Sequence, residues 1–191
     1  MEYLDTVLEA IAVLTGLAYL IEAARLKRYC WVYGGISSLL YIYIFFNANL
    51  YVDGSLNVYY LLMAFVGWFG WGKNQAVLPV TTLKIGELLL CILVPLVLAA
   101  FLGWGLERFT PAEYPLTDSF IGALAVTATW LTVRKKIETW PFWVVADGVA
   151  AVLFFYKELY LTAGLMVIYC VLAIVAWINW HKERTHATAT A

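Results

Sequence analysis

Long apolar runs alternate with short polar segments along the whole chain. Each of seven such runs is close to the roughly 20 residues that a helix needs to cross the core of a bilayer. The runs cover residues 5–24, 30–48, 54–72, 83–104, 117–133, 139–156 and 160–180. Apolar residues occupy all sides of these runs rather than every second position, which favours helices over the strands of a barrel. The pattern therefore predicts an all-α membrane protein with seven transmembrane helices and short loops.

Two parts of the chain repeat each other. Residues 31–73 recur as residues 140–182, at a constant spacing of 109 positions and without a gap. The identical pairs include tryptophans and other large residues: Trp31 and Trp140, Phe45 and Phe154, Phe46 and Phe155, Leu50 and Leu159, Tyr51 and Tyr160, Leu56 and Leu165, Tyr60 and Tyr169, Trp68 and Trp177, Trp71 and Trp180, Lys73 and Lys182.

This repeat predicts how the chain is organised. The matched segments contain the second and third predicted helices and the sixth and seventh, and the first and fifth helices complete each half by position. We expect a first three-helix repeat at 1–73, a connector helix with its flanking loops at 74–109, a second three-helix repeat at 110–182 and a disordered cytoplasmic tail at 183–191. Because one helix separates the halves, both enter the membrane in the same direction as parallel repeats. Such repeats are typical of transporters with a substrate site between the halves.

Composition and charge agree with a membrane location. Of the 191 residues, 64% are hydrophobic and 13% are charged, against about a quarter charged in soluble domains. Ten of the 12 Lys and Arg residues fall in loops on one side of the predicted membrane. Positive loops stay in the cytoplasm, so we expect the N-terminus outside and the C-terminus inside. The acidic N-terminus lacks the features of a signal peptide, so the first helix should be retained. The net charge of −1 gives no support for nucleic-acid binding.

Asp147 is the most conspicuous polar residue within a predicted span. It lies in the sixth run, and the repeat places Ser38 at the equivalent position, so the charge belongs to one half only. An acid in hydrocarbon is costly unless it is used or paired, which favours a role as anchor for a cationic or amide-bearing substrate. The other interpretation is a protonated acid that hydrogen-bonds a neighbouring hydroxyl or packs between helices.

Two amides within the spans are weaker candidates. Asn57 lies near the outer part of the third run, and Asn179 lies near the inner end of the seventh. Asn57 is a candidate either for substrate binding or for hydrogen bonds that join helices at about 0.6–2 kcal/mol. Asn179 is a candidate either for substrate binding or for solvation, because it lies close to the membrane interface.

Aromatic residues inside the spans form a further set of candidates. Trp143 lies about one helical turn from Trp140 and from Asp147, and Tyr41 and Tyr60 also fall within spans. A tryptophan one turn from a carboxylate suits a flat cationic ring, which stacking and a cation–π attraction of about 0.5–2 kcal/mol would hold. Tryptophans at helix ends are expected in the belt at the membrane interface instead; these are Trp31, Trp104 and Trp180.

Several of these residues fall in motifs that resemble the PnuC family of vitamin transporters. Gly-Trp-Phe-Gly-Trp at 67–71, preceded by Asn-Val-Tyr-Tyr at 57–60, is similar to the Trp-x-x-Trp signature of that family. Trp-Pro-Phe-Trp-Val-Val-Ala-Asp at 140–147 and Glu-Leu-Tyr-Leu-Thr-Ala at 158–163 resemble its second-half pattern. The resemblance covers nearly the whole chain and implies the same three-one-three helix arrangement, which is similar to that of SWEET sugar transporters.

The resemblance implies a function. The family carries vitamin precursors by facilitated diffusion, with trapping by a cytoplasmic vitamin kinase, and works as a homotrimer in the bacterial inner membrane. Nicotinamide riboside is the first expected substrate and thiamine the alternative, since both offer a flat cationic ring. The implied substrate-binding residues are Trp68, Trp71, Asn57, Trp140, Trp143 and Asp147. Tyr60, Tyr41 and Asn179 complete the candidate site from the residue-level argument.

Other classes of protein fit the sequence less well. An enzyme is not expected, because His181 and His186 are the chain's two histidines and both lie in the basic tail. No metal or cofactor is implied, since the three cysteines are scattered over different predicted helices. A SWEET-like sugar carrier would favour amides over a buried acid. A non-transporting membrane sensor remains the other alternative, although it normally needs an output module.

Overall fold

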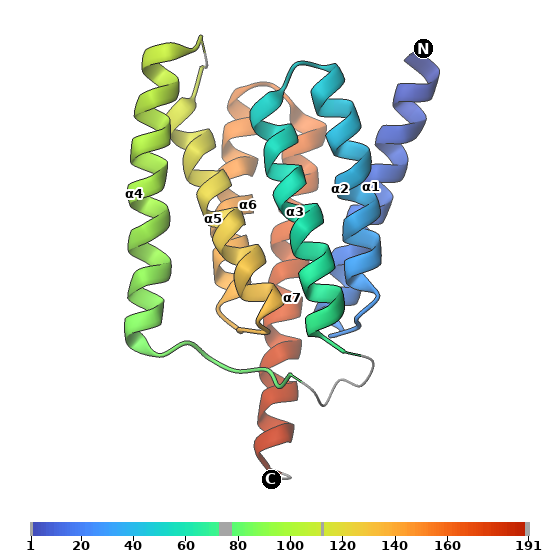
Figure 1. Ribbon diagram of the computed structural model, residues 1–191, viewed down its shortest axis with the longest axis vertical. Helices are drawn as coiled ribbons and strands as arrows, with labels where there is room; N and C mark the ends of the chain where they lie inside the picture. The colour runs from blue at the N-terminus through green and yellow to red at the C-terminus, as the bar shows by residue number, and fades with distance from the viewer. Residues whose placement is uncertain (1, 73–77, 112, 190–191) are drawn as a thin grey trace.

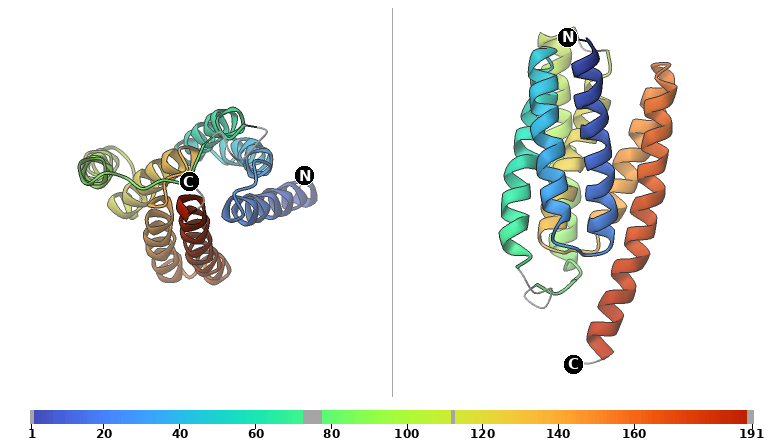
Figure 2. Two further views of the ribbon diagram at one scale, coloured as in Figure 1. Left: turned by 90° about the horizontal axis from the view of Figure 1, so that it is seen from below. Right: turned by 90° about the vertical axis from the view of Figure 1, so that its right-hand side faces the viewer.

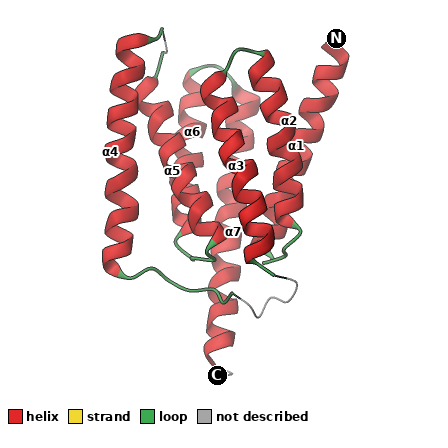
Figure 3. Ribbon diagram, viewed as in Figure 1, coloured by secondary structure: helices red, strands yellow, loops and turns green. Residues whose placement is uncertain are grey.

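Seven helices account for nearly all of the computed structural model, which describes residues 2–72, 78–111 and 113–189. They are α1 (Glu2–Ala24), α2 (Cys30–Asn47), α3 (Tyr51–Gly70), α4 (Ile85–Phe109), α5 (Pro115–Val133), α6 (Thr139–Tyr156) and α7 (Tyr160–Ala189). Within this described part no strand forms, and the β-structure is one isolated bridge between Thr81 and Lys136 (Figure 3). The predicted all-α fold with seven helices is confirmed.

Six of the helices form a closed ring. Around it α1 contacts α2, α2 contacts α3, α3 contacts α5, α5 contacts α6, α6 contacts α7 and α7 returns to α1 (Figure 2). The connector α4 packs outside the ring, against α5 (Figure 1). The two three-helix halves therefore meet along two seams, α3 with α5 and α1 with α7.

The backbone repeats at the same spacing of 109 positions as the sequence. α2 and α6, Cys30–Asn47 and Thr139–Tyr156, begin and end at equivalent positions, and α3 and α7 begin at equivalent tyrosines. Leu26 and Lys135 adopt φ values of 56° and 50°, and Asn49 and Glu158 both adopt 59°. Residues other than glycine rarely adopt positive φ. The matching angles therefore show that the turns of the two halves have the same backbone conformation. α1 and α5 also end at equivalent residues, although their sequences match poorly.

Most of the helices are suited to a membrane. Among the described residues, α1, α2 and α4 to α7 are long and apolar enough to cross a bilayer by length and composition. α3 is less apolar because Asp53, Ser55 and Asn57 interrupt its first half. It lies between α2 and α5 in the ring, so protein covers it on two sides.

The last helix is longer than the sequence predicts. α7 continues to Ala189, so residues 183–189 are helical where a disordered tail was expected. This segment begins with good helix formers, and the Thr185 hydroxyl donates to the His181 carbonyl at 2.9 Å. The extension projects beyond the bundle (Figure 1). Lys73, the first residues of the expected connector segment and residues 190–191 lie outside the described part.

Candidate substrate-binding site

Four tryptophans pack together at one end of the ring, which we call the basic end because most Lys and Arg residues lie there. Trp31, Trp71, Trp140 and Trp180 are each at most 3% exposed. Trp31 meets Trp71 edge to face at 5.4 Å, and Trp140 meets Trp180 in the same way at 5.2 Å. Trp71 and Trp180 join the two pairs at 6.1 Å. The interface-belt prediction is therefore wrong for Trp31 and Trp180, whereas Trp104 is 59% exposed, as a belt residue would be.

Hydrogen bonds from this tryptophan cluster cross between the halves. The Trp71 indole N–H donates to the Val133 carbonyl at the end of α5, at 3.1 Å. The Trp180 indole N–H donates to the Ala23 carbonyl near the end of α1, at 3.0 Å. Each half thus bonds the first helix of the other half. Trp31 and Trp140, also equivalent by the repeat, bury indole N–H groups with no partner among the described residues. The four tryptophans thus belong to one packed core at the basic end of the ring.

The cross-half bonds should contribute measurably to stability. We expect Trp180→Phe to lower the free energy of unfolding by about 1–3 kcal/mol, because it removes the indole hydrogen bond to the Ala23 carbonyl, which keeps only the Leu26 N–H, and leaves a gap in the buried cluster. Trp177→Phe is the matched control, since Trp177 lies on the same helix but is 40% exposed and should change stability by under about 0.5 kcal/mol. Thermal unfolding of the purified variants measures both, and equal losses would contradict the role of the indole bond.

Asp147 lies on α6 and is 9% exposed. The ion pairs found among the described residues are Arg25 with Glu22 and Lys157 with Asp118, so Asp147 has no basic partner there. Burying a carboxylate in this way is costly unless something compensates its charge. The site is therefore suited to a cation that the protein itself does not supply.

Two tyrosines related by the repeat lie near Asp147. Tyr60 on α3 and Tyr169 on α7 are both within electrostatic range of its carboxylate. α3 and α6 are not neighbours in the ring, so Tyr60 and Asp147 approach each other across its interior. Tyr41 lies near Tyr169 and stacks on Phe45 at 5.2 Å. Asp147, Tyr60, Tyr41 and Tyr169 are what we call the interior cluster.

The other predicted site residues belong to neither the tryptophan cluster nor the interior cluster. The Asn57 amide is buried but donates to the carbonyl of Asp53 on its own helix, at 2.9 Å. Trp143 is half-buried and packs against both apolar cores of the bundle. Trp68 is half-buried under the Arg28 guanidinium, 3.7 Å from the ring centroid. Asn179 is exposed on α7.

The structure adds residues that the sequence argument did not include. Tyr19 on α1 lies within hydrogen-bonding range of Thr132 on α5 and within electrostatic range of Tyr59 and Tyr60 on α3. It therefore also faces the ring interior. Tyr169 could have been found, because it is the repeat partner of Tyr60. No such signal pointed to Tyr19, since the first and fifth helices match poorly.

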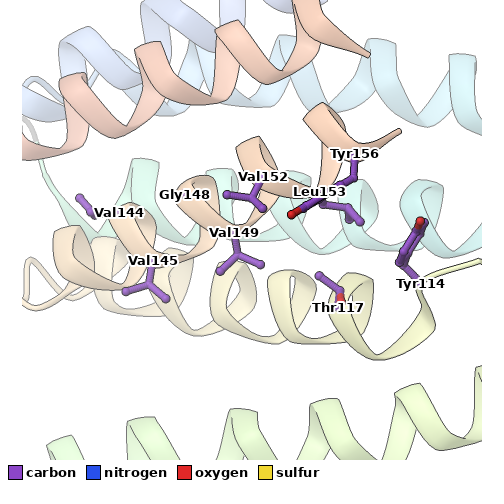
Figure 4. Close-up of a pocket in the computed structure, with 9 residues that line it drawn as sticks. All are labelled: Tyr114, Thr117, Val144, Val145, Gly148, Val149, Val152, Leu153 and Tyr156. Atoms are coloured by element: carbon purple, nitrogen blue, oxygen red, sulfur yellow. The ribbon is translucent and has the colours of Figure 1, made fainter. Parts of the chain in front are cut away.

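A surface groove of about 640 Å³ lies along α6 and the start of α5 (Figure 4). Apolar residues of α6, among them Val145, Val149 and Val152, form most of its wall, and Tyr114 and Thr117 lie at its other side. Successive helix residues are about 100° apart, which puts these valines on the face opposite Asp147. The groove contains none of the predicted site residues.

Comparison with known proteins defines the class. Residues 6–182 match the family described as "Nicotinamide mononucleotide transporter". The chain therefore belongs to this family of multi-pass membrane transporters.

Individual relatives agree with this assignment. The chain is 25% identical over 211 residues to "Nicotinamide riboside transporter PnuC" of Escherichia coli (strain K12), covering 93% of this chain and 87% of that protein. It is 26% identical over 194 residues to the protein of the same name from Neisseria mucosa, covering 93% of this chain and 73% of that protein. A solved structure, "Crystal structure of the Vitamin B3 transporter PnuC", superposes with a TM-score of 0.75 at 22% identity over 95% of this chain and 83% of the other. The two share a fold.

Proposed function

We propose that this protein carries a flat, cationic vitamin precursor across the membrane by facilitated diffusion, and that the substrate is nicotinamide riboside. The observation that carries the proposal is Asp147, a buried carboxylate that has no basic partner among the described residues and lies within electrostatic range of Tyr60 in the other half. A positively charged ring would compensate this charge, and the neighbouring aromatic side chains would stack on the ring. The names of the curated relatives support the riboside as the substrate.

The chemistry of the interior cluster favours the riboside over the mononucleotide in the family's description. A mononucleotide carries a phosphate, which would meet the Asp147 carboxylate inside the ring, and like charges at short range repel. Thiamine also carries a cationic ring, so it is the alternative substrate.

Transport would proceed by rocking of the two halves about the substrate. In this proposal the basic end faces the cytoplasm, because Lys and Arg are retained there, and the N-terminus lies outside. The tryptophan cluster would then be the cytoplasmic gate. Opening it requires breaking the Trp71–Val133 and Trp180–Ala23 bonds together. The substrate would move down its concentration gradient and be trapped by a cytoplasmic kinase. The protein would work as a homotrimer in the inner membrane.

Tryptophan fluorescence of the purified protein tests the substrate directly. We expect saturable quenching by nicotinamide riboside, because the ring would bind beside Trp143 and close to the tryptophan cluster. Thiamine, riboflavin and glucose are titrated side by side. Quenching by thiamine alone would name the alternative substrate, and a response to glucose alone would contradict the cationic-ring proposal.

A further inference from the structure

Lys135 is buried at the basic end of the ring. It lies in the turn between α5 and α6, with φ of 50° and an exposure of 2%. Its backbone N–H donates to Thr132 at 3.0 Å, and its carbonyl accepts from Thr81 at 3.1 Å. The turn is therefore fixed on both sides, and it directs the side chain inward. The flanking Arg134 is exposed and Lys136 is half-buried.

The ammonium of Lys135 lies over Trp71, 4.8 Å from the ring centroid. Burial lowers the pKa of this amine below its usual value, and the nearby Cys30 and Glu183 partly oppose that shift. The ring of Trp71 offers the buried cation an attractive face. Trp71 belongs to the first half and Lys135 to the second, so this contact crosses the seam in parallel with the Trp71–Val133 bond.

The repeat shows that the fold does not require a charge at this position. The equivalent residue is Leu26, which has almost the same φ, 56°, and is also buried, at 8% exposed. A leucine thus fills the corresponding place at the other seam. The ammonium of Lys135 is an addition specific to the second half, and its contact is with the gate tryptophan of the first.

We propose that Lys135 is a positioning residue that holds Trp71 in the closed gate by cation–π attraction across the seam between the halves. This proposal rests on the alternating-access transport proposed above. Release of Trp71 from Val133 then requires Lys135 to leave the ring as well. The contact stabilises the closed state alone, so its loss shifts the population toward the open gate.

The accessibility of Cys30 reports on this gate without any substrate. Cys30 is 0% exposed and packs in the same core as the four tryptophans. In a background with Cys91→Ala and Cys170→Ala, the rate of reaction with N-ethylmaleimide measures how often this core opens. We expect Lys135→Met to raise the rate roughly five- to 30-fold, the range of a single buried cation–π contact. Lys135→Arg, which keeps the cation, should stay within about twofold of the parent.

Arg134→Met is the matched control. Arg134 is the adjacent residue, and its guanidinium lies 4.2 Å over Trp130, but both belong to the second half and Trp130 is 41% exposed. Its removal should leave the labelling rate within about twofold of the parent, because surface contacts contribute little. An unchanged rate in Lys135→Met, or a rate in Arg134→Met as high as in Lys135→Met, would overturn the proposal.

A double-mutant comparison tests whether Lys135 acts through Trp71. In a Trp71→Leu background, Lys135→Met should add less than about a twofold increase, since the partner is already gone. A full increase there would show that Lys135 acts elsewhere. If Lys135→Met is not recovered as a folded protein, Lys135→Gln replaces it with the same expected rates. Because labelling needs no substrate, a failed vitamin titration and a failed gate experiment are distinguishable.

Discussion

Asp147→Asn should reduce nicotinamide riboside uptake at least about tenfold, because a buried charge–charge contact of even 1.4 kcal/mol corresponds to that factor. The asparagine keeps the size of the side chain and removes the charge, so the change isolates electrostatic recognition. The expected loss is large because Asp147 is nearly buried and has no basic partner among the described residues. Initial uptake rates in proteoliposomes loaded with the purified variants measure it.

Two further variants serve as controls for Asp147→Asn. Asp147→Glu keeps the charge and should retain more uptake than Asp147→Asn. Glu107→Gln removes an exposed acid from α4, which packs outside the ring, and should leave uptake unchanged. Normal uptake kinetics in Asp147→Asn would remove Asp147 from the mechanism, and the buried acid would then be a packing or hydrogen-bonding feature.

Gly67→Ala should destabilise the protein by about 1–3 kcal/mol, the usual cost of overpacking a buried site. A Cβ at Gly67 on α3 would overlap the indole of Trp31 on α2. Trp31 has little room to move, because it is 3% exposed and lies against Trp71 in the tryptophan cluster. The midpoint of thermal unfolding should fall accordingly.

Gly70→Ala is the control for this substitution. It lies one turn further along the same helix, and a Cβ there would meet nothing within 4 Å. Alanine is favoured over glycine in helices by about 1 kcal/mol, so this variant should be as stable as the parent or slightly more so. Similar losses in both variants would indicate a general effect of glycine on α3 rather than a clash with Trp31.

Local pattern was sufficient to predict most of the fold. Helices form wherever about 20 apolar residues follow one another, since hydrocarbon leaves the backbone no other partner. The boundaries of α2 and α6 were accordingly predicted to within a residue. The end of α7 was missed, because its last residues are polar and polarity alone does not distinguish a helix in water from a disordered tail.

The orientation of side chains was far less predictable. In a soluble helix the apolar face marks the core, but a membrane helix is apolar on every side. The family resemblance implied that Trp71 and Trp140 line the substrate site, and in the structure both are buried within the tryptophan cluster. Trp31 and Trp180 were assigned to the belt on their position near helix ends, although the repeat pairs them with Trp140 and Trp71.

The sequence by itself determined the class of this protein, its seven helices, its internal repeat and the isolated acid at Asp147. These are properties of single residues or of runs along the chain. Only the tertiary structure decided which helices meet at the seams, that Tyr60 and Tyr169 come within electrostatic range of Asp147, and that Lys135 lies over Trp71. Such contacts join residues far apart in the chain, and they depend on the rotation of each helix about its own axis. In an apolar solvent that rotation is set by packing between helices rather than by hydrophobicity.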